Sequence, residues 1–372
     1  MQLKWLAATV AVCAVSFSSP ALGQTIDDRR ASASFRVYTD NDHMTVVSPS
    51  AGAQAPVTET LGVDANVTAD IISGASVDVI SEASPTAISE TRIEGGVGVS
   101  WRSHRLATLR ARTTFSHEPD FESLRLSIGA NVELAKRNTT VDVLYVAGAD
   151  SIGTTVDPTF DKSRRVHQLT ATLTQAVDER TYVDIVGEGR RASGYHANPY
   201  RTVPIIDATS PTFMRVEEVT PRLRHAGALQ ARVRRAIDAR ARVVAHLSYR
   251  LYQDSWSVRS HTGTLTTIGQ FTKRVRLGLT MRGYTQSAAD FFRSNYVLDG
   301  GMAPALRTRE RRLGRMRSLF GGATADVALS ERIDQGPRIV IAGSLMRFWW
   351  PDFPAQSERT ALSLTVAASA VF

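Results

Sequence analysis

Hydrophobic and polar residues alternate one by one along most of this chain, which is the pattern of β-strands with one apolar face. The stretch from Leu61 to Ile71 is an unbroken example, with apolar residues at odd positions and mainly Asp, Asn and Thr between them. Each such segment reaches the roughly 9–11 residues that a tilted strand needs to cross a bilayer. Fourteen are recognised: 58–72, 87–101, 105–117, 121–134, 139–148, 164–177, 180–191, 221–235, 240–252, 257–271, 273–287, 317–331, 337–348 and 358–372.

The connections between these segments alternate in length. Residues 135–138, 178–179 and 332–336 are short, whereas residues 192–220 and 288–316 are long. Alternating short and long connections are typical of the periplasmic turns and extracellular loops of outer-membrane barrels. The sequence therefore predicts an all-β fold, a transmembrane antiparallel up-and-down β-barrel of about fourteen strands with periplasmic N- and C-termini.

Both ends of the chain add to this prediction. Lys4 followed by an apolar run predicts a cleaved signal peptide at residues 1–23. Residues 24–57 are interpreted either as a plug-like periplasmic segment or as a first hairpin, which would raise the barrel to sixteen strands. Residues 58–372 form the predicted barrel. Its last strand ends at Phe372, in register with the apolar face, as is common in strands that the barrel-assembly machinery is thought to recognise.

Composition favours anions as partners. The net charge is +8, and only four of the 44 basic residues are lysines. Charges on a lipid face cost roughly 2–4 kcal/mol at the midplane, so the strand charges are assigned to the lumen. They either line a water-filled channel or pair across a filled interior. The candidate lumen residues are Arg110, Arg112, Arg125, Arg242, Arg250, Arg274, Arg276, Arg282, Asp64, Asp70 and Glu133.

Several motifs are more specific than barrel alternation requires. They lie at residues 70–78, 194–201, 249–262 and 282–291. In order and spacing they resemble a bacterial family of proteins of unknown function that are predicted to be outer-membrane β-barrels, over nearly the whole mature chain. Because the motifs fall at one end of the predicted strands, we expect them to converge on an extracellular mouth. The candidate mouth residues are Ser73, Gly74, Asp78, Asn198, Tyr200, Arg201, Asp254, Trp256, His261, Gln286 and Asp290.

Enzyme chemistry is weakly supported. Ser260 with His261, or His246 with Ser248, offers a nucleophile and a base, but no orienting acid or oxyanion donor is evident. Asp40, Asp42, Asp70 and Asp78 are read as turn-forming or lumen carboxylates rather than calcium ligands. We therefore expect no enzyme activity, cofactor, metal or nucleic acid.

The predicted location is the Gram-negative outer membrane, and the predicted partners are its lipid, lipopolysaccharide and the barrel-assembly machinery. The leading functional hypothesis is a porin-like channel, or a transporter or binding barrel, for small solutes, with some bias towards anions. The alternatives are a non-conducting barrel that scaffolds an envelope complex through its loops and, less favoured, a lipase-type barrel hydrolase.

Overall fold

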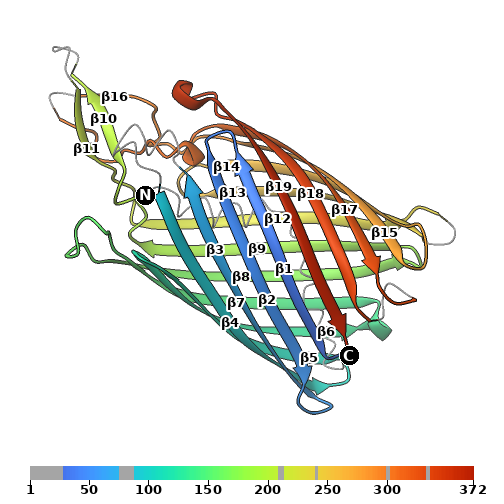
Figure 1. Ribbon diagram of the computed structural model, residues 1–372. Helices are drawn as coiled ribbons and strands as arrows, with labels where there is room; N and C mark the ends of the chain where they lie inside the picture. The colour runs from blue at the N-terminus through green and yellow to red at the C-terminus, as the bar shows by residue number, and fades with distance from the viewer. Residues whose placement is uncertain (1–27, 75–87, 208–212, 239–241, 299–301, 332–335) are drawn as a thin grey trace.

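A closed antiparallel barrel makes up most of the protein (Figure 1). The computed structural model describes residues 28–74, 88–207, 213–238, 242–298, 302–331 and 336–372. Within these residues the barrel wall has sixteen strands. They are β1 (Arg30–Asp40), β2 (Met44–Pro56), β3 (Leu61–Gly74), β4 (Ile88–His104), β5 (Ala107–Glu118), β6 (Phe121–Leu134), β7 (Thr139–Ile152), β8 (Lys162–Asp178), β9 (Thr181–Gly194), β12 (Leu223–Ala236), β13 (Val243–Asp254), β14 (Arg259–Gln270), β15 (Val275–Gln286), β17 (Met316–Ala328), β18 (Arg338–Trp349) and β19 (Glu358–Val371).

The predicted fold class is confirmed. Each of the fourteen predicted segments corresponds to one wall strand, from β3 to β19. Residues 30–56 supply the other two as a hairpin, so the barrel has the sixteen strands of the second interpretation and these residues do not form a plug. The hairpin closes the cylinder because β1 pairs with β19, with Arg30 opposite Val371.

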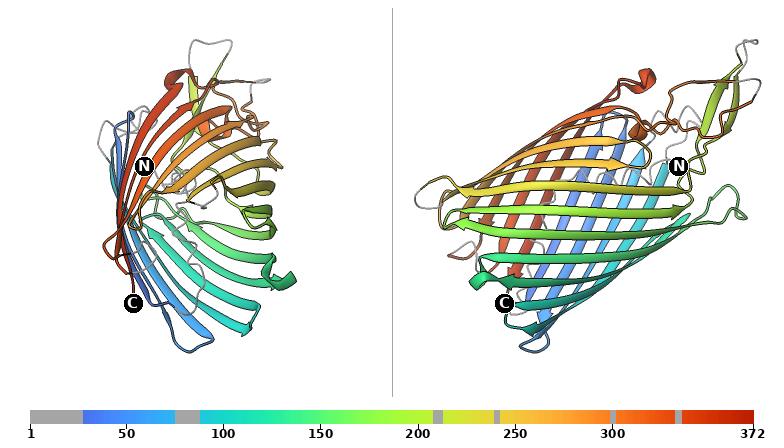
Figure 2. Two further views of the ribbon diagram at one scale, coloured as in Figure 1. Left: turned by 90° about the vertical axis from the view of Figure 1, so that its right-hand side faces the viewer. Right: turned by 180° about the vertical axis from the view of Figure 1, so that it is seen from behind.

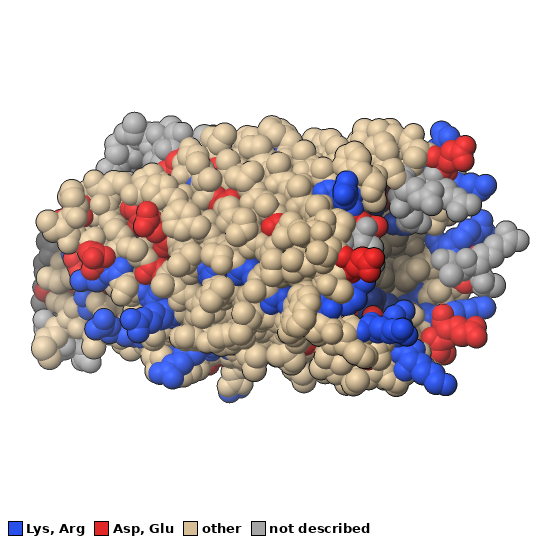
Figure 3. All heavy atoms as spheres, turned by 90° about the horizontal axis from the view of Figure 1, so that it is seen from below, with Lys and Arg blue, Asp and Glu red and all other residues tan. Residues whose placement is uncertain are grey.

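The alternation along each strand separates an outer apolar face from a polar lumen. On β6, Leu124, Leu126 and Ile128 are 51%, 52% and 54% exposed on the outer face. Arg125 and Ser127, between them, take the inward register. Figure 3 shows one side of the barrel as largely uncharged, with charged side chains most frequent towards its two ends. This is the surface that a lipid-facing barrel needs.

The two ends of the barrel differ, as Figure 2 shows. The end where β1 begins and β19 stops carries short connections, and we call it the turn end. The opposite end carries the long connections between β9 and β12 and between β15 and β17, and we call it the loop end. These two connections form a small sheet in the order β11-β10-β16 that projects beyond the wall. Its strands are β10 (Thr202–Ile206), β11 (Phe213–Glu217) and β16 (Tyr296–Val297).

Helical structure is confined to single 3₁₀ turns in the part of the chain that the structure describes. They are η1 (Ala135–Arg137), η2 (Arg311–Leu313) and η3 (Pro354–Gln356). No helix among the described residues has the length and apolar character needed to cross a membrane. The predicted signal peptide at residues 1–23 lies outside the described residues.

Candidate functional site

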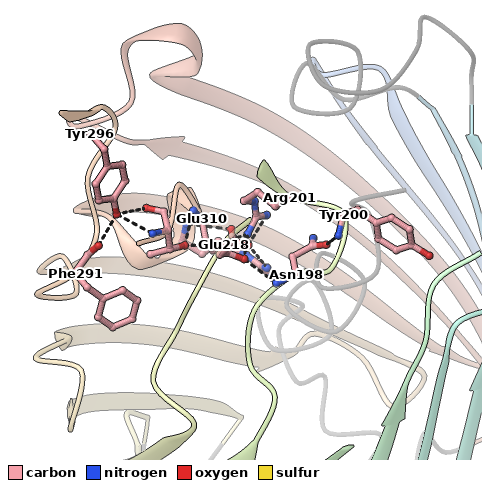
Figure 4. Close-up of polar contacts among 9 residues, drawn as sticks. Asn198, Tyr200, Arg201, Glu218, Phe291, Tyr296 and Glu310 are labelled. Atoms are coloured by element: carbon pink, nitrogen blue, oxygen red, sulfur yellow. Dashed lines mark hydrogen bonds and ion pairs between the residues drawn. The ribbon is translucent and has the colours of Figure 1, made fainter. Parts of the chain in front are cut away.

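A buried polar cluster joins the two long connections at the loop end (Figure 4). Arg201 follows β9 and Glu310 precedes β17, yet Arg201 Nη2 lies 2.7 Å from Glu310 Oε2. Arg201 Nη1 also lies 3.3 Å from Glu218 Oε1, and the hydroxyl of Thr308 donates to the same oxygen. The pairing of opposite charges, with several hydrogen bonds to each group, offsets the free-energy cost of burying them.

Asn198 and Tyr296 extend this cluster through backbone groups. The Asn198 amide donates to Glu218 Oε2 at 2.7 Å, and the Thr308 amide donates to the Tyr296 hydroxyl at 2.7 Å. That hydroxyl donates in turn to the Phe291 carbonyl at 2.6 Å. The connections between strands are thus held by side chains that replace the missing ladder bonds.

A second cluster surrounds the turn between β13 and β14. The Asp254 carboxylate accepts from the amides of Trp256 and Val258 at 2.9 and 3.0 Å, which fixes the turn. The Trp256 ring is buried, with Phe291 edge-on at 5.2 Å and His196 edge-on at 5.4 Å between ring centroids. Three of the sequence motifs therefore meet on one indole ring.

A third cluster ties the β1–β2 hairpin to this end. Arg359, on β19, contacts the carboxylates of both Asp40 and Asp42. Arg311 Nη2 lies 3.4 Å from Asp42 Oδ2, and its guanidinium lies 4.7 Å from the Trp350 ring centroid. The acidic hairpin residues are therefore held by arginines, in addition to the turn bonds that Asp40 accepts from the Asp42 and Met44 amides.

These clusters form a continuous chain of contacts that we call the collar. The Tyr200 hydroxyl donates to Asp120 in the β5–β6 turn and accepts from the Thr155 amide in the β7–β8 connection. Arg201, Trp256 and Arg311 carry the chain onward through the β9–β12, β13–β14, β15–β17, β18–β19 and β1–β2 connections. The remaining connection at this end, residues 75–87, lies outside the described residues.

The structure brings most of the motif residues together at the loop end. Asn198, Tyr200, Arg201, Asp254 and Trp256 belong to the collar. Gln286 joins it by donating to the carbonyls of Arg312 and Gly314, and Asp290 by accepting from the Ser257 hydroxyl. Ser73 and Gly74 end β3 at the same end, where they pair with β2, and Asp78 lies outside the described residues.

His261 does not join the collar. Its side chain is on the outer face of β14, where a ring nitrogen lies 2.7 Å from the Tyr249 hydroxyl. Ser260 is buried on the inner face. Adjacent strand residues point to opposite faces, so the Ser260 hydroxyl and the His261 ring are separated by the wall and do not form a nucleophile–base pair.

Most predicted lumen charges do take inward positions, and there they form pairs. Arg110 Nη2 lies 2.6 Å from Asp142, Arg250 Nη2 lies 2.6 Å from Glu188, and Arg276 Nη1 lies 3.9 Å from Asp326. Arg112 pairs with Asp64, Arg282 lies over the Phe320 ring, and Asp70 accepts from the Ser48 hydroxyl.

Three of the predicted lumen charges sit elsewhere. Arg242 and Arg274 lie just beyond the strand ends, in the connections of the turn end, because β13 and β15 begin one residue later than each. Glu133 lies near the last position of β6 and pairs with Arg137 in the adjoining turn. These residues flank the turn end of the barrel rather than the middle of its lumen.

The structure adds inward arginines that the sequence prediction missed. Arg164, Arg190 and Arg224 face the lumen near the loop end, close to the predicted Arg125. Two of them occur in Arg-Arg pairs, Arg164 with Arg165 and Arg190 with Arg191, which place one arginine on each face. Such pairs interrupt the alternation of polar and apolar residues from which inward-facing residues are predicted.

Electrostatics within the collar follow from burial and from these partners. Burial alone would raise the pKa of Glu310, but the adjacent Arg201 and Arg312 hold it well below its usual range. Burial, together with nearby Arg164, lowers the pKa of His196 to about 4. At neutral pH the collar therefore contains an ionised Glu310 and an uncharged His196 ring.

One known family matches most of the barrel in sequence. The model of the family described as "Protein of unknown function (DUF3570)" matches residues 76–339. The chain belongs to this family. The match confirms the predicted family resemblance, although it leaves out β1, β2, β3, β19, most of β18 and the first six residues of the 70–78 motif. No curated protein matches the chain in sequence.

Several solved structures are similar to this chain. A bacterial polysaccharide outer membrane secretin is similar with a TM-score of 0.52 and 8% identity, over 92% of this chain and 98% of that chain. OmpT of Vibrio cholerae, as a loop-deletion mutant, has a TM-score of 0.48 and 8% identity, over 93% and 98%. The siderophore receptor PirA of Pseudomonas aeruginosa has a TM-score of 0.46 and 10% identity, over 87% of this chain. The chain spans 56% of that receptor. At 8% identity, the similarity to the secretin bears on the fold alone.

Proposed function

We propose that the protein is an outer-membrane channel, or a transport or binding barrel, for small solutes, with a preference for anions. The observation that carries the proposal is the guanidinium lining of the lumen on β6, β8, β9, β12 and β15. Barrels of sixteen strands are also wide enough to enclose an aqueous channel. Fixed positive charge on a narrow, low-dielectric wall raises the local concentration of anions.

The proposed orientation has the collar at the cell surface and both chain ends in the periplasm. Support comes from a set of arginines on the outer face close to the loop end, which suit the phosphate groups of lipopolysaccharide. They are exposed and lie on β8, β9, β14 and β17: Arg165, Arg191, Arg259 and Arg317.

Planar-bilayer conductance of the refolded protein tests the channel. Under a KCl gradient, the reversal potential should indicate anion preference. Arg276→Ser and Arg282→Ser, which change inward residues, should reduce that preference. Arg274→Ser is the matched control, because Arg274 lies outside the wall strands and should matter much less. A folded barrel that never conducts would refute the channel.

A scaffold is the second candidate, because of the small sheet at the loop end. Phe213 and Met214 on its outer strand β11 are 61% and 50% exposed, and β11 pairs with β10 alone among the described strands. An open strand edge with apolar side chains is suited to adding a strand from a protein partner. A non-conducting barrel that retains a stoichiometric envelope partner, and loses it on Phe213→Ser with Met214→Ser, would favour this role.

A further inference from the structure

Four inward arginines lie on neighbouring strands directly below the collar. Cross-strand pairing aligns Arg125 on β6 with Arg224 on β12, with only Gly148, Val166 and Ala192 between them. Arg164 lies one inward position nearer the loop end, opposite Gly194, and Arg190 lies one inward position farther, opposite Gln168. The four guanidinium groups thus surround a strip of small side chains.

The small residues leave space for the arginine side chains. A Cβ atom at Gly148 would overlap Arg125 Nη1, so the glycine makes room for this guanidinium against the wall. Arg224 is held from its other side, since its guanidinium lies 4.4 Å from the Trp256 ring centroid. The arginines are therefore positioned by the wall and by the collar before any ligand arrives.

Carboxylates neutralise only part of this charge. Asp150 forms an ion pair with Arg125, with Nη2 2.5 Å from Oδ1, and accepts a hydrogen bond from Arg164 Nε at 2.7 Å. Asp254 accepts Arg224 Nε at 2.8 Å. Among these residues, Arg190 is the arginine that neither Asp150 nor Asp254 contacts.

Arg190 is the arginine left over. It is exposed on the lumen side and has no carboxylate or hydrogen-bond partner among the described residues. The nearest inward acid on its own strand, Glu188, is already engaged 2.6 Å from Arg250 Nη2. Arg190 nevertheless interacts electrostatically with Arg125, Arg164 and Arg224, so like charges are held together where the described carboxylates do not balance them.

The His196 ring adds a polar group beside these arginines. It interacts electrostatically with Arg164, Arg190 and Arg224, and its Nε2 is buried without a hydrogen-bond partner among the described residues. Buried polar atoms are normally satisfied, so an unpaired nitrogen beside surplus guanidinium groups indicates a place that a polar ligand completes.

We propose that Arg125, Arg164, Arg190 and Arg224 form a binding site for a phosphate group within the lumen. The several oxygens of a phosphate group match the forked N–H donors of arginine, and its negative charge suits the Arg190 guanidinium, whereas chloride has no matching geometry. The site rests on the proposed function in that it would concentrate phosphate-bearing solutes at the mouth of the channel.

Binding is tested on the full barrel refolded in detergent, independently of conduction. Inorganic phosphate is titrated by calorimetry at constant ionic strength, with chloride as the competing anion. Arg190→Gln should weaken phosphate binding at least tenfold and still fold, because Arg190 has no described partner to lose. Arg347→Gln is the matched control, because Arg347 lies on the outer face of β18, and this variant should bind phosphate as the wild type does.

The outcomes separate the site from the channel. Phosphate binding that depends on Arg190 in a barrel that does not conduct would support the site and refute the channel. A conducting barrel in which wild type and Arg190→Gln bind phosphate equally, or not at all, would overturn the site and leave the channel standing. Tighter binding of glycerol 3-phosphate than of inorganic phosphate would support the site and identify an organic phosphate as its solute, and the reverse order would identify free phosphate.

Discussion

Arg201 Nη2 lies 2.7 Å from Glu310 Oε2, although four wall strands, β12 to β15, lie between the two residues along the chain. The pair ties the β9–β12 connection to the β15–β17 connection, which also meet where β10 pairs with β16 in the small sheet. Neither connection has a barrel ladder of its own. Buried charges therefore contribute to holding these connections together, alongside backbone bonds such as that from the Val219 amide to the Arg307 carbonyl.

Arg201→Met should loosen the collar without unfolding the barrel. The change leaves Glu218 and Glu310 buried with one cation fewer, which costs ~3 kcal/mol when a buried pair is broken. Hydrogen exchange at the Asn198 and Glu218 amides should accelerate by roughly a hundredfold, because each 1.4 kcal/mol is a factor of about ten.

Arg315→Met provides the matched control. Arg315 pairs with Asp352 through Nε at 2.9 Å, but its side chain is largely exposed. An exposed pair contributes only ~0–1 kcal/mol. Equal exchange in the two variants would show that the buried pair does not hold the collar.

Gly194→Ala should disturb the exit of the chain from β9. Gly194 has φ +122°, which residues with a side chain rarely adopt, and an added Cβ would overlap the Ser163 carbonyl oxygen. Since the obstacle is backbone, relaxation is difficult and the cost should be ~1–3 kcal/mol or more. Gly187→Ala is the control, because nothing lies within 4 Å of the position that its Cβ would take. Thermal unfolding followed by heat-modifiable electrophoresis should show a lower midpoint for Gly194→Ala alone.

Acidification should loosen the β9–β12 connection through His196. Burial, with Arg164 nearby, lowers the pKa of His196 to about 4, so between pH 6.5 and 4 the docked connection binds fewer protons than the opened one. Docking is therefore strongest above pH 6.5 and weakens as the pH falls towards 4. The hydrogen-exchange rates of the Asn198 and Glu218 amides, corrected for the intrinsic pH dependence of exchange, should rise as the pH falls from 7 to 5.

Substitution of His196 tests whether this residue causes the pH dependence. His196→Gln should remove most of it, whereas His261→Gln, on the outer face of β14, should leave it intact. An unchanged pH response in His196→Gln would locate the titrating group elsewhere.

The wall was predictable because lipid and lumen impose a strict period of two, which the run from Leu61 to Ile71 displays in full. The β1–β2 hairpin was harder, since Ser48 to Pro56 is rich in small residues with little contrast between faces. The sequence predicted that the collar residues lie at one end of the barrel, but not which of them contact one another. Pairs such as Arg201 with Glu310, or Arg311 with Asp42, join positions far apart in the chain, and no local pattern encodes which arginine meets which carboxylate.

Phe372 offers a prediction about assembly rather than stability. Its side chain is 80% exposed on the outer face, and its amide donates to the Arg29 carbonyl at 2.9 Å. Phe372→Ala keeps that backbone bond, so the refolded barrel should unfold at nearly the wild-type temperature. If the assembly machinery recognises the strand that ends at Phe372, as the sequence predicts, the amount of heat-modifiable barrel in the outer membrane of a Gram-negative host should fall several-fold. Val371→Ala, one residue earlier and on the other face of β19, should accumulate normally. Equal accumulation of Phe372→Ala and wild type would show that the Phe372 side chain is not needed for biogenesis.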